Sequence, residues 1–392
     1  MIASVLRRLA ALALVAASLW SASPQAMAVE PFYAASALEL EGPPGSIIRV
    51  QPWPVEGIYR ANIYRILYRS RGLRNEPIAV SASVIVPQFA VPPGGRPVIA
   101  WAHPTTGVAT QCAPTLSETP FNSIAGLTQF VADGAVVVAT DYPGLGTAGI
   151  HPYLIGESEG RAVLDSIRAV RQMPEAAAGP LAALWGHSQG GQAVLWAGQI
   201  QPSYAPEVKL AGIAAAAPAS NLAGLLDNDA PTIDGKILVA LALHSWSKLF
   251  GYSVQSIIEP NDVPAIEQAG RDCVDITSSA LAALQSVSAI NGVYLKRNPA
   301  VTPPWSETIA ANSAGRAPIA APLFIAQGDS DAVVEPKVTQ AYVQGLCGRG
   351  EQVNLLMMRG VDHGKAAWQA ASQANTWIMN RFYGRPLYGA CR

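Results

Sequence analysis

The chain has 392 residues, of which 50% are hydrophobic and only 14% are charged, and its formal net charge is −1. Charged residues usually make up about 25% of a soluble domain, and intrinsic disorder requires a composition poor in apolar residues and rich in charge. The composition therefore excludes a disordered chain. No basic run or stripe occurs in the sequence, so we expect no nucleic acid among the partners.

Residues 1–28 have the pattern of a secretory signal peptide. Arg7 and Arg8 form a positive n-region, Leu9–Trp20 forms a short apolar h-region, and residues 26–28 (Ala-Met-Ala) fit the small-x-small rule, which predicts cleavage after residue 28. The apolar stretch is too short for a spanning helix, although an uncleaved membrane anchor is the alternative. We therefore expect a secreted or periplasmic protein.

Four cysteines follow the predicted signal peptide. An even count in an exported chain predicts two disulfides, and the residues alone leave three pairings open. The cysteines lack the close spacing of a zinc site, so we expect no metal at them. They are Cys112, Cys273, Cys347 and Cys391.

Two kinds of apolar pattern predict a β-sheet. Ile58–Tyr68 and Ile78–Val86 alternate apolar and polar residues, which predicts an antiparallel pair of strands. Six later runs are short and continuously apolar, which is typical of strands buried on both faces of a parallel sheet. These runs are Pro97–Ala102, Ala135–Thr140, Leu181–Trp185, Leu210–Ala217, Pro322–Ala326 and Val353–Met358.

Helical patterns lie between the apolar runs, at Glu157–Met173, Ser188–Ile200 and Gly364–Phe382. Alternating strands and helices after an antiparallel pair predict the α/β class, with a mostly parallel sheet covered by helices on both faces.

One interval interrupts this alternation. Residues 220–321 separate two predicted core strands, whereas ordinary connections in such folds are a few residues long. The interval contains its own apolar helical patterns, at Ile237–Phe250 and Ile276–Val287. We interpret it as a lid or cap inserted into a core made of residues 29–219 and 322–392.

The segment Gly186–Gly191 (GHSQGG) is a G-x-S-x-G nucleophile elbow. It follows a predicted buried strand and opens a predicted helix, which is the context that this motif requires. Glycines two positions before and after Ser188 remove side chains that would collide in so tight a turn. The segment predicts Ser188 as a nucleophile; a glycine-rich helix start without chemistry is the alternative.

Serine needs a general base at neutral pH, and in α/β hydrolases the chain order is serine, acid, histidine. Only His244 and His363 follow Ser188. His244 falls in an apolar helical pattern of the lid, which indicates a packing role. His363 follows the last predicted core strand, where open α/β sheets bind ligands, so we predict His363 as the base.

The acid that orients His363 should follow the strand Pro322–Ala326. Both Asp329 and Asp331 lie there, and the spacing of the subsequent apolar pair and proline selects Asp331. Asp329 is then a carboxylate that stabilises its own turn. Asp362 adjoins His363 directly and is interpreted as structural.

The tetrahedral intermediate requires two N–H donors. The residue after the nucleophile, Gln189, supplies one. The other should come from the loop after Pro97–Ala102, but Pro104 has no N–H. We favour Thr106, with Thr105 as the alternative, and expect His103 to brace this loop.

In these segments the chain resembles the α/β-hydrolase superfamily and, more narrowly, the secretory, lipase A-type lipases. Most of residues 97–364 take part, and one departure is Pro104, where many bacterial members carry glycine. The segments are WAHPTTG (101–107), CAP (112–114), DYPGLG (141–146), GHSQGG (186–191), GDSDAVVEP (328–336) and GVDHG (360–364).

The resemblance implies an esterase or lipase with a helical lid, and it implies the disulfides Cys112–Cys273 and Cys347–Cys391. We expect a secreted serine carboxylester hydrolase acting through an acyl-enzyme on apolar esters, with medium or long acyl chains or polymeric substrates. A short-chain carboxylesterase, an acyltransferase with the same triad, a peptidase and a non-catalytic binding module are the alternatives. We expect no cofactor, and the partners would be a small-molecule, lipid or polymer ester and a transient lipid interface.

Overall fold

The computed structural model describes residues 30–392 except 55–59, 230–232, 275–294, 390 and 392. The predicted signal peptide and the helical pattern Ile276–Val287 therefore lie outside the described residues. Residues Phe32–Arg392 form one compact unit. Among the described residues, no helix combines the length and the apolar character needed to cross a membrane.

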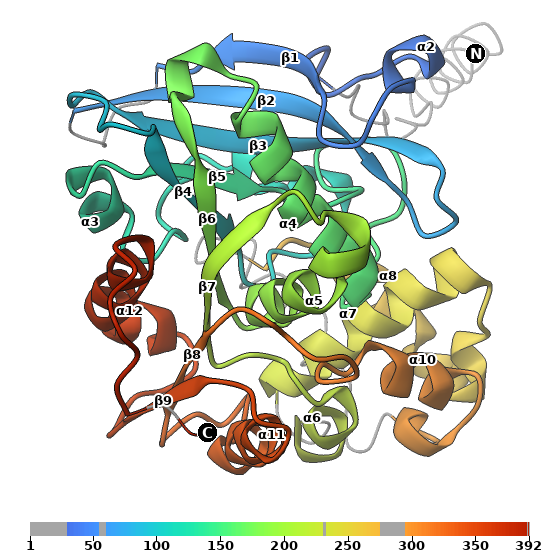
Figure 1. The fold of residues 1–392 in the computed structure, drawn as a ribbon. Coiled ribbons are helices and arrows are strands. Elements are labelled where there is room, and N and C mark those ends of the chain that lie inside the picture. The colour runs from blue at the N-terminus through green and yellow to red at the C-terminus, as the bar shows by residue number, and fades with distance from the viewer. Residues whose placement is uncertain (1–29, 55–59, 230–232, 275–294, 390, 392) are drawn as a thin grey trace, which may run out of the picture. The chain divides into compact units, whose positions relative to one another are not determined.

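The unit is built on a nine-stranded sheet with the order β1-β2-β3-β5-β4-β6-β7-β8-β9 (Figure 1). β1, β2, β3 and β5 are joined by antiparallel pairing, and the six strands from β5 to β9 in that order pair in parallel. The open, mostly parallel sheet confirms the predicted fold class. The strands are β1 (Ile47–Pro52), β2 (Ala61–Arg71), β3 (Pro77–Pro87), β4 (Arg96–Ala102), β5 (Val136–Thr140), β6 (Ala178–His187), β7 (Lys209–Ala216), β8 (Leu323–Gly328) and β9 (Val353–Met358).

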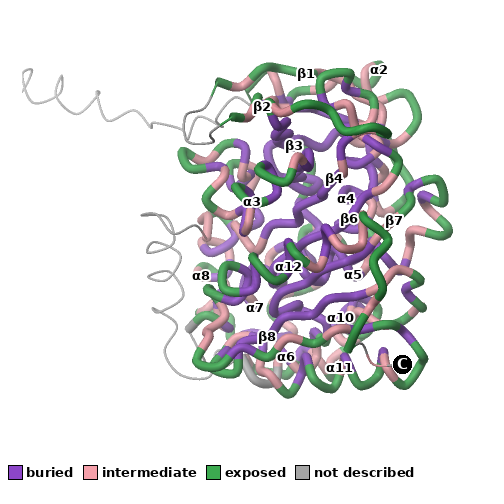
Figure 2. Tube along the Cα trace, turned by 60° about the vertical axis from the view of Figure 1, so that its left-hand side comes forward, coloured by how far each residue is buried: buried purple, intermediate pink, exposed green. Residues whose placement is uncertain are grey.

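The central strands are mostly apolar because both faces of the sheet are covered. Every residue of β5 is buried, and so is every residue of β8. Figure 2 shows the same burial along the central strands, with exposed residues on the outer sides of the helices. Trp101 of β4 and Trp185 of β6 pair in register, with ring centroids 5.8 Å apart, so two of the largest side chains of the core fill one face of the sheet.

Helices cover both faces, as predicted. α4 and α5 pack with β2, β6 and β7 on one face, while α3 and α12 join a separate core cluster on the other face, together with Trp101 and Trp185. The helices outside the β7–β8 connection are α2 (Ala37–Leu40), α3 (Leu127–Ala132), α4 (Gly156–Val170), α5 (Gln189–Tyr204), α11 (Pro336–Gly348) and α12 (Ala366–Phe382).

A long connection joins β7 to β8, although these two strands are neighbours in the sheet. It contains α6 (Leu222–Asp229), α7 (Ile233–Phe250), α8 (Val263–Ala269) and α10 (Trp305–Asn312). The predicted helix Ile237–Phe250 falls inside α7, and Leu222, Leu225 and Ile237 belong to the same core cluster as Trp185.

Both disulfides that the resemblance implied are present. Cys112–Cys273 joins the segment after β4 to the β7–β8 connection, and Cys347–Cys391 joins α11 to the C-terminal segment. Next to the first disulfide, the Val274 N–H donates to the Thr106 carbonyl over 2.8 Å. The loop beside Ser188 is therefore attached to the connection by a covalent bond and by a backbone hydrogen bond.

Candidate active site

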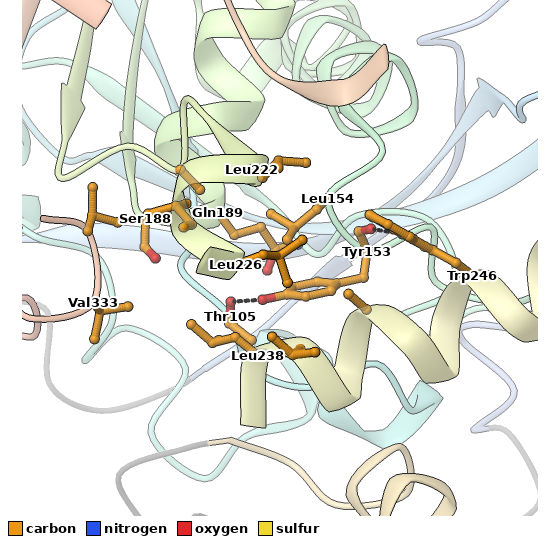
Figure 3. Close-up of a pocket in the computed structure, with 15 residues that line it drawn as sticks. Thr105, Tyr153, Leu154, Ser188, Gln189, Leu222, Leu226, Leu238, Trp246 and Val333 are labelled. Atoms are coloured by element: carbon orange, nitrogen blue, oxygen red, sulfur yellow. Dashed lines mark hydrogen bonds between the residues drawn. The ribbon is translucent and has the colours of Figure 1, made fainter. Parts of the chain in front are cut away.

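Ser188 lies in the turn between β6 and α5, with φ 57° and ψ −116°. Such a positive φ is strained for a residue with a side chain, and it raises the Ser188 hydroxyl to the surface of a cavity beside Thr105 (Figure 3). A Cβ atom on Gly186 would overlap the carbonyl of Gly190, and one on Gly190 would overlap the carbonyl of Ala102. The glycines of the motif thus let three backbone segments meet at the nucleophile.

We expect Gly190→Ala to lower the free energy of unfolding by about 3 kcal/mol or more, because the new methyl group meets the fixed Ala102 carbonyl and not a side chain that can move. Urea unfolding followed by circular dichroism measures this loss. Gly345→Ala in α11 is the matched control, since its nearest neighbouring atom would be 3.9 Å away and alanine favours a helix. Equal stability of the two variants would contradict the prediction.

The structure brings Ser188, His363 and Asp331 together. His363 Nε2 lies 2.9 Å from Ser188 Oγ, and His363 Nδ1 lies 2.8 Å from Asp331 Oδ2. His363 lies between β9 and α12, and Asp331 follows β8, so both come from the same edge of the sheet as Ser188. This is the geometry of a nucleophile, a base and an orienting carboxylate.

Asp331 is held ionised by its surroundings. Burial opposes its charge, but hydrogen bonds from His363 and from the N–H groups of Val334 and Val333 outweigh burial and lower the pKa of the carboxyl below its usual value. The Gln327 amide also donates to Asp331 Oδ2, over 3.0 Å. Sequence analysis did not find Gln327, whose only signal is a polar residue at the end of an apolar strand.

The rejected alternatives lie elsewhere. Asp329 is exposed and accepts the Gly360 N–H, so it stabilises a turn. Asp362 pairs at the surface with Lys365. His244 lies on α7, 3.6 Å from Glu267. His103 is buried, with its ring nitrogens against the carbonyls of Pro104 and Asp141, which fits the predicted bracing role.

The two predicted oxyanion donors come from different segments, Gln189 from the start of α5 and Thr106 from the loop after β4. Gln189 is the first residue of α5, so its N–H has no partner within the helix, and the structure shows no acceptor for it among the described residues. Thr106, which we favoured, lines a neighbouring cavity. Thr105 lines both of the cavities that contain Ser188, and its hydroxyl lies 2.8 Å from the Tyr153 hydroxyl.

An apolar cavity of about 50 Å³ adjoins Ser188, and we call it the acyl cavity (Figure 3). Its walls come mainly from α6 and α7, which project aliphatic side chains and one indole towards the nucleophile. They include Leu222, Leu225, Leu226, Leu238, Val239 and Trp246. Among the described residues, no group of three or more His, Cys, Asp or Glu side chains is placed to hold a metal ion.

A buried polar cluster supports the nucleophile turn from behind, and sequence analysis did not find it. The Gln189 amide donates to Glu159 Oε1 over 2.7 Å and to His151 Nε2 over 3.1 Å. His151 Nδ1 in turn donates to the Pro143 carbonyl over 2.9 Å. Burial raises the pKa of Glu159 to about 8 and lowers that of His151 to about 3, so both groups are neutral at pH 7.

We expect the free energy of unfolding to fall by on the order of 1 kcal/mol between pH 6.5 and 8. Burial raises the pKa of Glu159 to about 8 and that of Asp141 to about 7, so the folded protein retains protons that the unfolded chain has lost. The stabilisation from these retained protons is complete in acid, and it is lost as the pH rises through the folded-state pKa values of Asp141 and Glu159. The buried histidines act in the opposite direction, because His103, His151 and His187 stay neutral when the unfolded chain takes up protons; this effect is largest in acid and fades by pH 8.

Glu159→Gln should flatten the alkaline decline, since glutamine keeps an oxygen acceptor for Gln189 and has no proton to lose. Urea midpoints at pH 6.5, 7 and 8 measure the effect. The exposed Glu175→Gln is the control. Parallel stability curves for Glu159→Gln and the unaltered protein would refute the assignment of the decline to Glu159.

Comparison with known proteins places these features in a family. A family model described as secretory lipase matches residues 121–390. Lipase 6 of Candida albicans is 25% identical, over 96% of this chain and 85% of that protein. A Mycobacterium tuberculosis protein named as a probable inactive lipase is 24% identical, over 91% of this chain and 83% of its own length.

The fold is also found among solved structures. The X-ray structure of Candida antarctica lipase A superposes with a TM-score of 0.75 at 20% identity, covering 92% of this chain and 87% of that one. This likeness shows a shared α/β-hydrolase fold.

Proposed function

This chain belongs to the secretory lipase family, and the relatives that it resembles include lipases. On this basis we propose that it is a secreted serine carboxylester hydrolase. The observation that carries the proposal is the chain of short contacts from Asp331 through His363 to Ser188. Membership alone does not establish activity, since one relative is named as inactive. The geometry of the three side chains is what supports catalysis here.

In the proposed reaction, His363 Nε2 takes the proton of the Ser188 hydroxyl while Ser188 Oγ attacks the ester carbonyl carbon. The resulting oxyanion is held by the Gln189 N–H and by an N–H of the Thr105–Thr106 segment. When the intermediate collapses, the bond to the alcohol oxygen breaks and His363 returns its proton to that oxygen. Water then attacks the acyl-enzyme with His363 as base and releases the acid and Ser188. Asp331 keeps its charge and stabilises the imidazolium.

We further propose that residues 220–321 act as a lid that selects the acyl group. The leucines of α6 and α7 line the acyl cavity, which supports an apolar acyl chain. The cavity volume of about 50 Å³ favours a short acyl chain in the conformation described. Medium and long chains require α6 and α7 to move apart, as contact with a lipid surface would allow.

Rates on p-nitrophenyl acetate, butyrate, octanoate and palmitate, with and without an emulsion, test both parts of this proposal. A burst of p-nitrophenol and an acyl adduct on Ser188, located by mass spectrometry, would support the acyl-enzyme. Rates that peak at octanoate or palmitate only with emulsion would identify a lipase, and rates that peak at acetate or butyrate would identify an esterase. Absence of hydrolysis across the series would reject the proposed function.

A further inference from the structure

Ser188 lies where the acyl cavity meets a second, more polar depression. This depression, which we call the polar groove, consists of three adjoining cavities of about 260, 300 and 480 Å³. The first contains Ser188 and His363 and shares His187 and Gly364 with the second. The second shares Asn122 and Trp368 with the third. The groove thus runs from the nucleophile along the start of α12 towards α3.

The position of His363 assigns the polar groove to one half of the ester. His363 lines the groove and does not line the acyl cavity. In the proposed function His363 must return a proton to the departing alcohol oxygen, and a general acid acts only within hydrogen-bond reach of that oxygen. The alcohol half of the substrate therefore lies in the groove. This step rests on the proposed function.

Asp234 lines the first cavity of the groove, whereas the second and third cavities combine the aromatic residues Phe121 and Trp368 with neutral polar groups. Trp368, on the first turn of α12, is 50% exposed although it is one of the largest apolar side chains. Among the described residues that line the second and third cavities there is no Lys, Arg, Asp or Glu. The polar side chains around Trp368 are hydroxyls and amides, including Thr119, Asn122, Thr128, Gln129 and Ser372.

We propose that the polar groove binds a carbohydrate, so that the substrate is a short-chain acyl ester of an oligosaccharide. A pyranose ring has an apolar C–H face that packs on an indole and a rim of hydroxyls that hydrogen-bond to neutral side chains. A purely aliphatic alcohol would make no hydrogen bonds with these exposed hydroxyls and amides, which would stay bonded to water. An anionic or cationic group would find no opposite charge in the second and third cavities as described.

The volumes of the polar groove and of the acyl cavity support an oligosaccharide more than a single sugar. The second and third cavities each fall within or close to the size range of pockets that hold drug-sized molecules. The acyl cavity is several times smaller than either of them. A small apolar acyl group on a long, neutral, hydroxyl-rich alcohol fits both sides at once.

The test uses the full chain with O-acetylated xylotetraose and p-nitrophenyl acetate as probes. We expect Trp368→Ala to lower the ratio of kcat/KM for the sugar ester to that for p-nitrophenyl acetate by at least tenfold. Trp368→Phe should restore most of this ratio, because phenylalanine keeps an aromatic face. Tyr383→Ala is the matched control, since Tyr383 is an exposed aromatic residue at the other end of α12.

A second measurement follows binding without turnover of the sugar. Unacetylated xylotetraose should inhibit p-nitrophenyl acetate hydrolysis competitively, and Trp368→Ala should raise its inhibition constant at least tenfold. An unchanged ratio and an unchanged inhibition constant in Trp368→Ala would overturn the carbohydrate assignment while leaving the proposed function intact. The carbohydrate assignment would also be overturned if Trp368→Ala lowered kcat/KM only for an aromatic diester such as bis(2-hydroxyethyl) terephthalate and not for the sugar ester. Failure to hydrolyse every p-nitrophenyl ester of the series, from acetate to palmitate, would instead refute the proposed function, and this inference with it.

Discussion

Ser188→Ala is expected to lower kcat on p-nitrophenyl butyrate by about 10⁶-fold, the size of loss that follows removal of the nucleophile in a serine hydrolase of this kind. The reason lies in the contact between Ser188 Oγ and His363 Nε2, at 2.9 Å, which supplies the only hydroxyl within reach of the base among the described residues. Without it, no acyl-enzyme can form. Steady-state kinetics and the absence of an acyl adduct measure the loss.

The control for this variant is Ser203→Ala, near the other end of α5, where the serine is exposed and its hydroxyl donates to the Ile200 carbonyl. It should keep full activity. Circular dichroism should show that both variants fold. A Ser188→Ala protein that retains more than a few per cent of the activity would show that another group is the nucleophile.

Asp331→Asn is expected to lower kcat by about 10⁴-fold. The asparagine amide keeps the size of the carboxylate, but it cannot stabilise the imidazolium, and it favours the wrong tautomer of His363. The carboxylate that is lost receives His363 Nδ1 over 2.8 Å on one oxygen and two backbone N–H groups on the other.

Asp329→Asn provides the matched comparison, since Asp329 precedes Asp331 by two residues and bonds to the Gly360 N–H and to Ser330. We expect its kcat to stay within about twofold of the original, because its partners belong to a turn. If Asp329→Asn lost activity and Asp331→Asn did not, the two aspartates would have to exchange roles.

The inner strands of the parallel core could be predicted because they are buried on both faces and therefore read as apolar runs, as Leu181–Trp185 in the centre of β6 does. Val353–Met358 is also predicted and observed with the same bounds, although β9 is an edge strand in which Leu355 and Met357 are exposed. β1 could not be predicted in this way. It lies at the edge of the sheet with exposed residues in its second half, so Ile47–Pro52 has neither an apolar run nor a clear alternation.

The sequence could bring the three candidate catalytic side chains to one end of the sheet, because each follows a core strand at a spacing that the turn geometry constrains. The residues that support them carry no such local signal. Glu159 and His151 come from α4 and the loop before it and reach Gln189 only through the packing of α4 on α5. In the amino-acid sequence, a buried glutamate of a helix cannot be told from an exposed one. Three-dimensional contact is therefore the information that the sequence lacked.

The long connection between β7 and β8 leaves the sheet and returns to it at adjacent positions. The Ala217 N–H donates to the Ala326 carbonyl over 2.8 Å, so the strands remain paired where the connection departs. Residues can thus be gained, lost or exchanged within it without shifting the register that places Ser188, Asp331 and His363. Substitutions in the connection can therefore change the lining of the acyl cavity during evolution while the three candidate catalytic side chains keep their positions on the sheet. Under the proposed function, the preference for an ester could diverge without loss of the reaction.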